Sequence, residues 1–334
     1  MSAAPGAPGA PASAGAPPET RALEPPATRV GRLVSGAYVE QRWEELKRAP
    51  ATARPLQVLD ATWFLKPVHG DRDARAEFAA RRVPGALFFD IDELSEPHTT
   101  LPHMNPEPAY LARKLGEMGV DPAAELVVYD AVGQFSAARA WWMLVGIGCD
   151  ALLLDGGLPK WISEGRPVAS GPPPVLTPRP PPGFTPRPAR DWVVSLAEME
   201  RLSKDASSVI FDARPAARFS GAAPEPRPGL RKGRIPNSYN VPFAQLLNKD
   251  GTFRGPAELL AAFERSGVDA SRVVNRRVVT TCGSGTTACI LSFALANFLG
   301  ASAPVYDGAF AEWAQVAHPE REVVDDSADA AKKP

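Results

Sequence analysis

The chain has 334 residues, 44% of them hydrophobic, which is long enough for two domains with real cores. Its formal net charge of −1 gives no electrostatic reason to expect a nucleic-acid or anionic-membrane partner. Three cysteines are too few for a disulfide framework, and no Cys-x-x-Cys pair indicates a metal site. No apolar run approaches the roughly 20 residues that cross a bilayer. These features predict a cytoplasmic protein that works without a metal or another cofactor.

The first 30 residues are mostly alanine, proline, glycine and serine, a composition that predicts a disordered tail. A first domain is expected over residues 31–167, where short apolar runs alternate with helical segments. Strands are predicted at 57–60, 85–89, 126–129 and 152–154, and helices at 35–48, 108–118 and 137–147. This alternation is typical of an α/β fold in which helices flank a mostly parallel sheet.

An internal repeat indicates that this domain occurs twice. Val58-Leu59-Asp60-Ala61 resembles Ile210-Phe211-Asp212-Ala213, and the segments around Trp161 and Trp313 also match. Each pair is separated by the same 152 residues. Between the copies, residues 168–190 are rich in proline and predict an extended linker. A second domain is therefore expected over 191–318, followed by a flexible C-terminal tail over 319–334.

The second copy contains a loop suited to a reactive thiol. Cys282 follows an apolar run and precedes Gly283, Ser284, Gly285, Thr286 and Thr287, after which a helical segment begins. A helix N-terminus carries unpaired N–H groups and a partial positive charge, which favour a thiolate over a thiol. The glycines allow the N–H groups of the loop to curl into an anion-binding nest. The matching position in the first copy is Asp130, so the first domain is expected to be catalytically silent.

Two tandem domains with a single cysteine loop resemble the rhodanese superfamily of sulfurtransferases. The run Cys282-Gly283-Ser284-Gly285-Thr286-Thr287-Ala288 is similar to the C-G-S-G-V-T-A loop of the 3-mercaptopyruvate sulfurtransferases in that family. The thiosulfate-specific members instead carry C-R-K-G-V-T, with two basic residues that suit a dianion. Thr286 departs from the family pattern, because valine is the usual residue there.

The resemblance implies roles for particular residues. Cys282 is the implied nucleophile and persulfide carrier, and the loop Gly283–Thr287 is implied to stabilise the persulfide. Ser284, His103 and Asp92 match the serine, histidine and aspartate of a proton relay, the last two coming from the silent domain. Arg218 and Arg227 match two substrate-binding arginines, and the planar guanidinium suits the carboxylate and ketone of a 2-oxo acid.

The expected activity is transfer of sulfane sulfur from 3-mercaptopyruvate through a Cys282 persulfide to a thiol such as thioredoxin, or to cyanide, with release of pyruvate. A thiosulfate sulfurtransferase is the nearest alternative, although the neutral Gly283 and Ser284 offer no cations to a dianion. A phosphatase of this fold would need an arginine six residues after the cysteine, where Ala288 stands. A non-catalytic persulfide-binding or redox-sensing module is the third alternative.

Several other residues have simpler interpretations. Cys149 and Cys289 are expected to be structural, and the pair Trp141-Trp142 is expected to contribute to domain packing. Asp60 and Asp212 are expected to cap the loops that follow their strands. Arg214 and Arg231 are interpreted as solvated surface charges.

Overall fold

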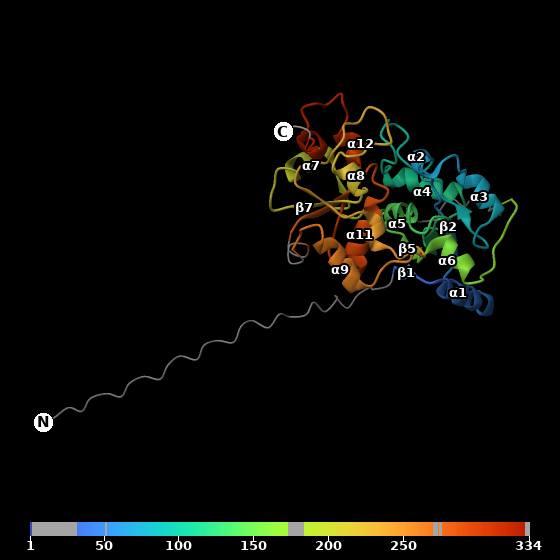
Figure 1. The fold of residues 1–334 in the computed structure, drawn as a ribbon. Coiled ribbons are helices and arrows are strands. Elements are labelled where there is room, and N and C mark those ends of the chain that lie inside the picture. Colours follow the sequence, from blue (N-terminus) through green and yellow to red (C-terminus); the bar gives the residue numbers. More distant parts are fainter. Residues whose placement is uncertain (2–31, 51, 173–183, 270–272, 274–275, 331–334) are drawn as a thin grey trace.

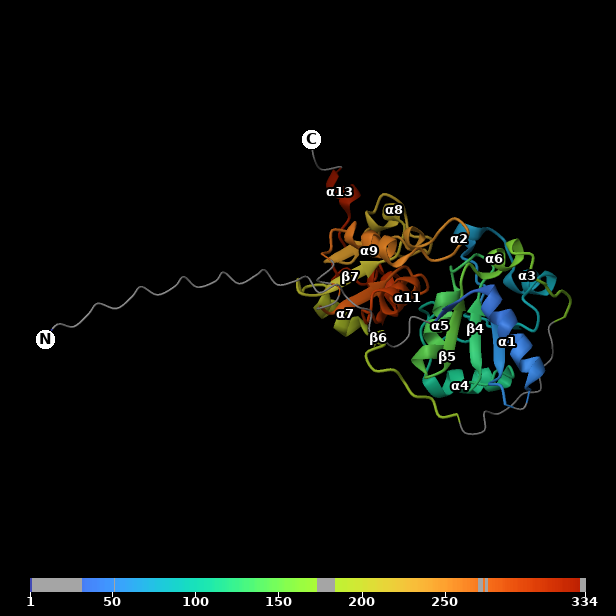
Figure 2. The same cartoon turned by 90° about the horizontal axis from the view of Figure 1, so that it is seen from below.

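A computed structural model describes the chain except residues 2–31, 51, 173–183, 270–272, 274–275 and 331–334. The predicted disordered tail over residues 1–30 and the middle of the predicted linker therefore lie almost wholly outside the described residues. The described part forms two α/β domains that lie side by side, one in blue to green and one in yellow to red (Figures 1 and 2).

The first domain is built on a five-stranded parallel sheet with the order β1-β5-β4-β2-β3. Its strands are β1 (Leu33–Val34), β2 (Leu56–Asp60), β3 (Leu87–Phe88), β4 (Glu125–Tyr129) and β5 (Asp150–Leu154). Its helices are α1 (Gly36–Arg48), α2 (Lys66–His69), α3 (Ala74–Ala80), α4 (Pro108–Glu117), α5 (Ala137–Gly146) and α6 (Gly157–Ser163). The predicted strands and helices of this domain agree with the corresponding elements to within about two residues, whereas β1, α2, α3 and α6 were not predicted.

The second domain repeats this topology in the order β6-β10-β9-β7-β8, again with parallel pairing. Its strands are β6 (Val193–Val194), β7 (Val209–Asp212), β8 (Ser238–Asn240), β9 (Val278–Thr281) and β10 (Val305–Tyr306). Its helices are α7 (Leu196–Leu202), α8 (Ala216–Phe219), the 3-10 helix η1 (Phe243–Leu246), α9 (Pro256–Glu264), α11 (Ala288–Phe298), α12 (Ala309–Trp313) and α13 (Asp326–Ala330). The identical strand order confirms the duplication inferred from the repeat.

The alternation of side chains along the strands produces a core on each face of each sheet. In β4, Leu126 and Val128 pack toward α4 and α5, whereas Val127 and Tyr129 pack toward α1 and α6. Successive residues of a strand point to opposite faces, so a strand with helices on both sides is apolar throughout. This is the reason the strands read as short continuous apolar runs.

The two domains share one continuous core where α5 meets α11 (Figures 1 and 2). The ring of Trp141 on α5 packs edge-on against Phe293 on α11, with their centroids 4.8 Å apart. Trp142 stacks on Trp192, which begins the second domain, at 5.8 Å. The predicted packing role of Trp141-Trp142 is confirmed, and this interface sets the relative position of the loops at the domain boundary.

The C-terminal segment differs from the expectation of a flexible tail. Val324 pairs with Arg234 in an antiparallel bridge, and the short helix α13 follows. The Ser327 hydroxyl donates to the carbonyl of Gly221, and Asp326 forms an ion pair with Arg234 at 2.5 Å. The polar composition of this C-terminal segment gave no sign of these contacts, because they depend on backbone pairing with a distant segment and not on apolar side chains.

Candidate active site

Cys282 lies in the loop between β9 and α11, at the carboxyl end of the central strands of the second sheet. Its side chain is buried, and its carbonyl accepts a hydrogen bond from the N–H of Phe310 at 3.0 Å. The carbonyl of Gly283 accepts a hydrogen bond from the N–H of Ala311 at 2.9 Å, so the first residues of α12 fix the backbone of this loop. Gly285 has a φ of 78°, a left-handed conformation that suits glycine. No N–H from Gly283 to Thr287 donates to another group in the described structure, which leaves these donors open to an anion.

The matching loop of the first domain shows what this backbone geometry can bind. Asp130 occupies the position of the cysteine and is fully buried. Five backbone N–H groups donate to its carboxylate at 2.7–3.1 Å, from Val132, Gly133, Gln134, Ser136 and Ala137. The first domain thus fills its own anion nest with the side chain of Asp130. A hollow of about 690 Å³ lies near this end of the first sheet, and its lining contains no cysteine or histidine.

His103, Asp92 and Ser284, for which the resemblance implies a proton relay, lie together across the domain boundary. Nδ1 of His103 lies 3.1 Å from Oγ of Ser284, and its Nε2 lies 3.1 Å from Oδ1 of Asp92. Trp63, which sequence reasoning missed, donates its indole N–H to the other oxygen of Asp92 at 2.9 Å. Because a carboxylate only accepts, Nε2 carries the imidazole proton and Nδ1 of the neutral ring is the acceptor.

The electrostatics of this group favour a neutral histidine next to an ionised aspartate. Burial lowers the pKa of His103, and the charges of Arg139 and Arg227 act in the same direction against the opposing effect of Asp92. Burial alone would raise the pKa of Asp92, but the hydrogen bonds from His103 and Trp63 outweigh it and lower that pKa. A neutral imidazole with a free Nδ1 lone pair can act as a general base.

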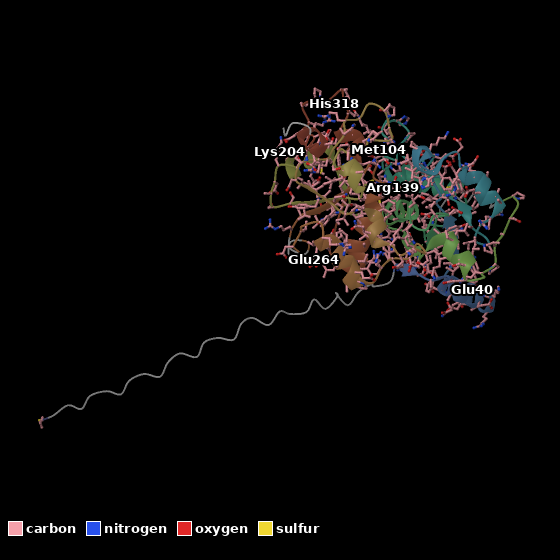
Figure 3. All side chains as sticks on the ribbon, viewed as in Figure 1. Glu40, Met104, Arg139, Lys204, Glu264 and His318 are labelled. Carbon is pink, nitrogen blue, oxygen red and sulfur yellow. The ribbon has the colours of Figure 1, made fainter. Side chains whose placement is uncertain are left out.

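A buried ion pair between the domains holds the His103 loop. Arg139 on α5 is fully buried and lies 2.8 Å from Asp307, which follows β10. The same guanidinium donates to the carbonyl of His103, and the other oxygen of Asp307 accepts from the N–H of Asn105 at 2.6 Å. Figure 3 labels Arg139 and Met104, and both lie where the two domains meet. A single arginine in the apolar sequence of α5 was the available signal for this pair.

Arg218 and Arg227 both line the cavity beside Cys282, as predicted. Nε of Arg218 donates to Glu225 at 3.1 Å, and its Nη2 also pairs with this carboxylate. Arg227 is half-buried and makes no hydrogen bond within the described part of the chain. Burial and the nearby Arg218 lower the pKa of Arg227, whereas the charge of Cys282 raises it. Arg227 is therefore placed to take an incoming anion without first breaking a bond.

The interpretation of Arg214 as a surface charge is wrong. Arg214 is buried and pairs with Asp212 at 2.6 Å and with Glu225 at 2.8 Å. Glu225 thereby bridges Arg214 and Arg218 and sets the position of the Arg218 guanidinium, which faces the cavity. Arg231 is also half-buried, and it donates to three backbone carbonyls. Comparison of the two repeats cannot detect Glu225 as a partner, because its loop has no counterpart of matching sequence in the first domain.

The remaining predictions can be compared with the structure directly. Asp60 and Asp212 cap their loops as predicted, each accepting from the backbone N–H two residues ahead at 2.9 Å. Cys149 and Cys289 are buried in the core. Among the described residues, no group of three or more His, Cys, Asp or Glu side chains is arranged to hold a metal ion. Within the same residues, no helix is long and apolar enough to cross a membrane.

The cavity at this site has a volume of about 470 Å³ and lies between the two domains. Cys282, Ser284 and Thr286 line it, together with the basic side chains of Arg214, Arg218, Arg227 and Lys249. Aromatic side chains from both domains complete the wall, namely Trp63, Phe135 and Phe243. Cys282, the two hydroxyls that contact His103 and two arginines therefore open into one space.

The family model of the rhodanese-like domain matches two segments of the chain, residues 45–164 and 195–316. The chain belongs to the rhodanese family. It is 37% identical over 290 residues to the human 3-mercaptopyruvate sulfurtransferase, a match that covers 85% of this chain and 94% of the relative. It is also 35% identical to the thiosulfate sulfurtransferase of Rattus norvegicus, covering 88% of this chain and 97% of that protein. The crystal structure of SseA from Escherichia coli, described as a 3-mercaptopyruvate sulfotransferase, superposes with a TM-score of 0.71 and 33% identity over 83% of this chain and 98% of SseA.

Proposed function

We propose that this chain transfers sulfane sulfur from 3-mercaptopyruvate to an acceptor through a persulfide on Cys282. As a two-domain rhodanese that resembles sulfurtransferases over most of its length, the chain is a transferase of sulfur-containing groups. The observation that supports the proposal most is the buried Cys282 in an open anion nest, facing two arginines in one cavity.

In the first half-reaction, the Cys282 thiolate attacks the sulfur of 3-mercaptopyruvate. The new bond joins the two sulfur atoms, and the carbon–sulfur bond of the donor breaks. The electron pair of that bond leaves on pyruvate as its enolate, which becomes pyruvate when its carbon takes up a proton. Arg218 and Arg227 hold the carboxylate and the ketone oxygen, where negative charge develops.

The proton that the enolate needs is available from the donor itself. The transferred sulfur arrives as a thiol, and the persulfide is more stable in the nest as an anion. We propose that His103 accepts this proton through a hydroxyl at Nδ1 and returns it to the enolate carbon. Asp92 stabilises the imidazolium that exists between the two transfers. The half-reaction then ends with pyruvate and a Cys282 persulfide anion, with no net gain or loss of protons.

In the second half-reaction, an acceptor removes the outer sulfur and regenerates the Cys282 thiolate. A thiol becomes a persulfide in this step, and cyanide becomes thiocyanate. We propose a thiol acceptor such as thioredoxin, because the cavity opens between the domains beside apolar and aromatic side chains. The three free cysteines support a reducing compartment such as the cytoplasm.

Mass spectrometry after treatment with 3-mercaptopyruvate tests the proposal. The protein should gain about 32 Da, one sulfur atom, as a covalent intermediate of the transfer. This gain should be absent in Cys282→Ser and present in Cys149→Ser, a control that replaces another buried cysteine with the same residue. Persulfide formation that survives Cys282→Ser would contradict the proposed role.

Thiosulfate is the second candidate donor, because a thiosulfate sulfurtransferase is among the relatives. The neutral Gly283 and Ser284 favour 3-mercaptopyruvate instead, because they offer no side-chain cation to a dianion. A Cβ at position 283 would lie 2.7 Å from Nη2 of Arg218, so glycine leaves this guanidinium room beside Cys282. Comparison of kcat/KM for the two donors with the same thiol acceptor decides between them.

A further inference from the structure

Thr286 makes a contact that valine, the usual family residue at this position, cannot make. Its Oγ1 lies 3.0 Å from Nδ1 of His103, and Oγ of Ser284 lies 3.1 Å from the same nitrogen. Both side chains are buried, at 3% and 5% exposure, and both line the cavity that contains Cys282. Neither hydroxyl has another hydrogen-bond partner within the described residues. Two equivalent hydroxyls therefore face one ring nitrogen.

The protonation of His103 limits what these two hydroxyls can do at the same time. Nε2 faces Asp92 at 3.1 Å and carries the proton, so the neutral ring has one lone pair, on Nδ1. One hydroxyl can donate fully to that lone pair while the other turns toward the cavity. When the ring is protonated, Nδ1 donates to either oxygen. A second hydroxyl thus keeps the imidazole bonded during a proton transfer that uses the first.

We propose that Thr286 is a second relay hydroxyl, interchangeable with Ser284 at Nδ1 of His103. This inference rests on the proposed function, because only the 3-mercaptopyruvate reaction moves a proton from the donor sulfur to the enolate carbon. The proton leaves the donor thiol, passes through either hydroxyl to Nδ1, and returns by the same route to carbon. Whichever hydroxyl carries the proton gains one proton and loses one in each transfer, so it ends unchanged.

Thiosulfate provides a control within the same active site. The Cys282 thiolate attacks its outer sulfur, the sulfur–sulfur bond of thiosulfate breaks, and sulfite leaves with the electron pair. No proton moves in this step, so a relay has nothing to do. A variant that damages only the relay should therefore slow loading from 3-mercaptopyruvate and leave loading from thiosulfate unchanged, whereas a damaged fold or nest would slow both.

The test is a double-variant cycle of Ser284→Ala and Thr286→Val, with single-turnover persulfide loading of Cys282 from each donor as the readout. Valine keeps the volume of threonine and removes only the hydroxyl. We expect each single variant to lose less than about threefold in loading from 3-mercaptopyruvate, the lower end of the scale of one hydrogen bond, so that independent effects would give less than about tenfold. The double variant should lose about 100-fold or more, the scale of general acid–base catalysis, with KM unchanged because the arginines remain.

Thr286→Ser should load at the rate of the parent, since it keeps the hydroxyl and loses only a methyl group. A double-variant loss equal to the product of the two single losses would overturn the inference, because independent residues give such a product. Equal slowing by Thr286→Val and Thr286→Ser would also overturn it and assign the effect to packing. A parent protein that loads from thiosulfate but not from 3-mercaptopyruvate would instead contradict the proposed function.

Discussion

The buried ion pair of Arg139 and Asp307 should contribute to both stability and turnover, and the variant Asp307→Asn tests this contribution. Burial lowers the pKa of Arg139, but the interactions with Asp307 and Cys289 together outweigh burial and raise it. Nε and Nη1 of Arg139 lack hydrogen-bond partners among the described residues, and Asp307 is the carboxylate that pairs with the guanidinium. Asparagine has nearly the same shape as aspartate, but it removes the charge and replaces one of the two accepting oxygens with an NH2 group, so it can keep only one of the bonds from Arg139 and from the N–H of Asn105.

The expected cost follows from leaving a fully buried cation without its partner. Breaking a buried ion pair from one side costs about 3–5 kcal/mol. For domains of this size, such a loss lowers the melting temperature by roughly 10 °C. Turnover of 3-mercaptopyruvate should fall as well, because Arg139 and Asp307 bond to the backbone of His103 and Asn105. Urea unfolding and steady-state kinetics measure the two effects.

Asp326→Asn is the matched control, since Asp326 pairs with Arg234 at 2.5 Å but is 53% exposed. An exposed pair contributes about 0–1 kcal/mol, so this variant should unfold close to the parent. Replacement of both buried partners, by Arg139→Met with Asp307→Leu, should recover much of the stability without recovering turnover. An Asp307→Asn protein that unfolds within about 1 kcal/mol of the parent would refute the reasoning, because exposed pairs already reach that value.

Two further predictions concern pH and the space around the loop. Because burial lowers the pKa of His103 below its usual value of 6.5, the acidic limb of kcat/KM should lie below pH 6.5. Asp92→Asn should move that limb to still lower pH, since the carboxylate that favours the imidazolium is gone; movement to higher pH would contradict the assignment. Gly283→Ala places a Cβ against Arg218 and should raise KM for 3-mercaptopyruvate about tenfold, the scale of a lost charged hydrogen bond. Unfolding should be unaffected, and an unchanged KM would show that Arg218 does not hold the donor.

The fold was accessible from the sequence because the repeat and the strand pattern are local signals. Short apolar runs separated by helical segments specify strands that are covered on both faces, and the repeat at 152 residues doubled the signal. β1 was missed, because Leu33 and Val34 form too short a run to be recognised. Its place in the sheet is set by pairing with β5, which no local pattern can specify.

Only part of the site could be predicted from the sequence, because its other contacts join residues that are distant in sequence. Cys282 and the glycines around it form a local motif that the sequence alone reveals. Glu225 and Trp63 belong to no such motif, and they contribute through hydrogen bonds with Arg218 and Asp92. Arg214 was misassigned for the same reason, since charge alone does not reveal a buried carboxylate nearby. Thr286 was noted as a departure, but the sequence could not show that its hydroxyl reaches His103.

In the proposed reaction, the first domain has no nucleophile of its own and is still necessary for catalysis. Asp130 fills the anion nest of the first domain, so that nest is stable without a ligand, at the cost of any chemistry there. The open nest around Cys282 has no such internal anion, and in the proposed reaction it depends on the first domain for a base. That base is delivered by the loop of His103, which Asp307 ties to the second domain through Asn105. Docking of the domains and assembly of the relay are therefore the same event, and a variant that loosens the interface should lose turnover before it loses the persulfide-bearing loop.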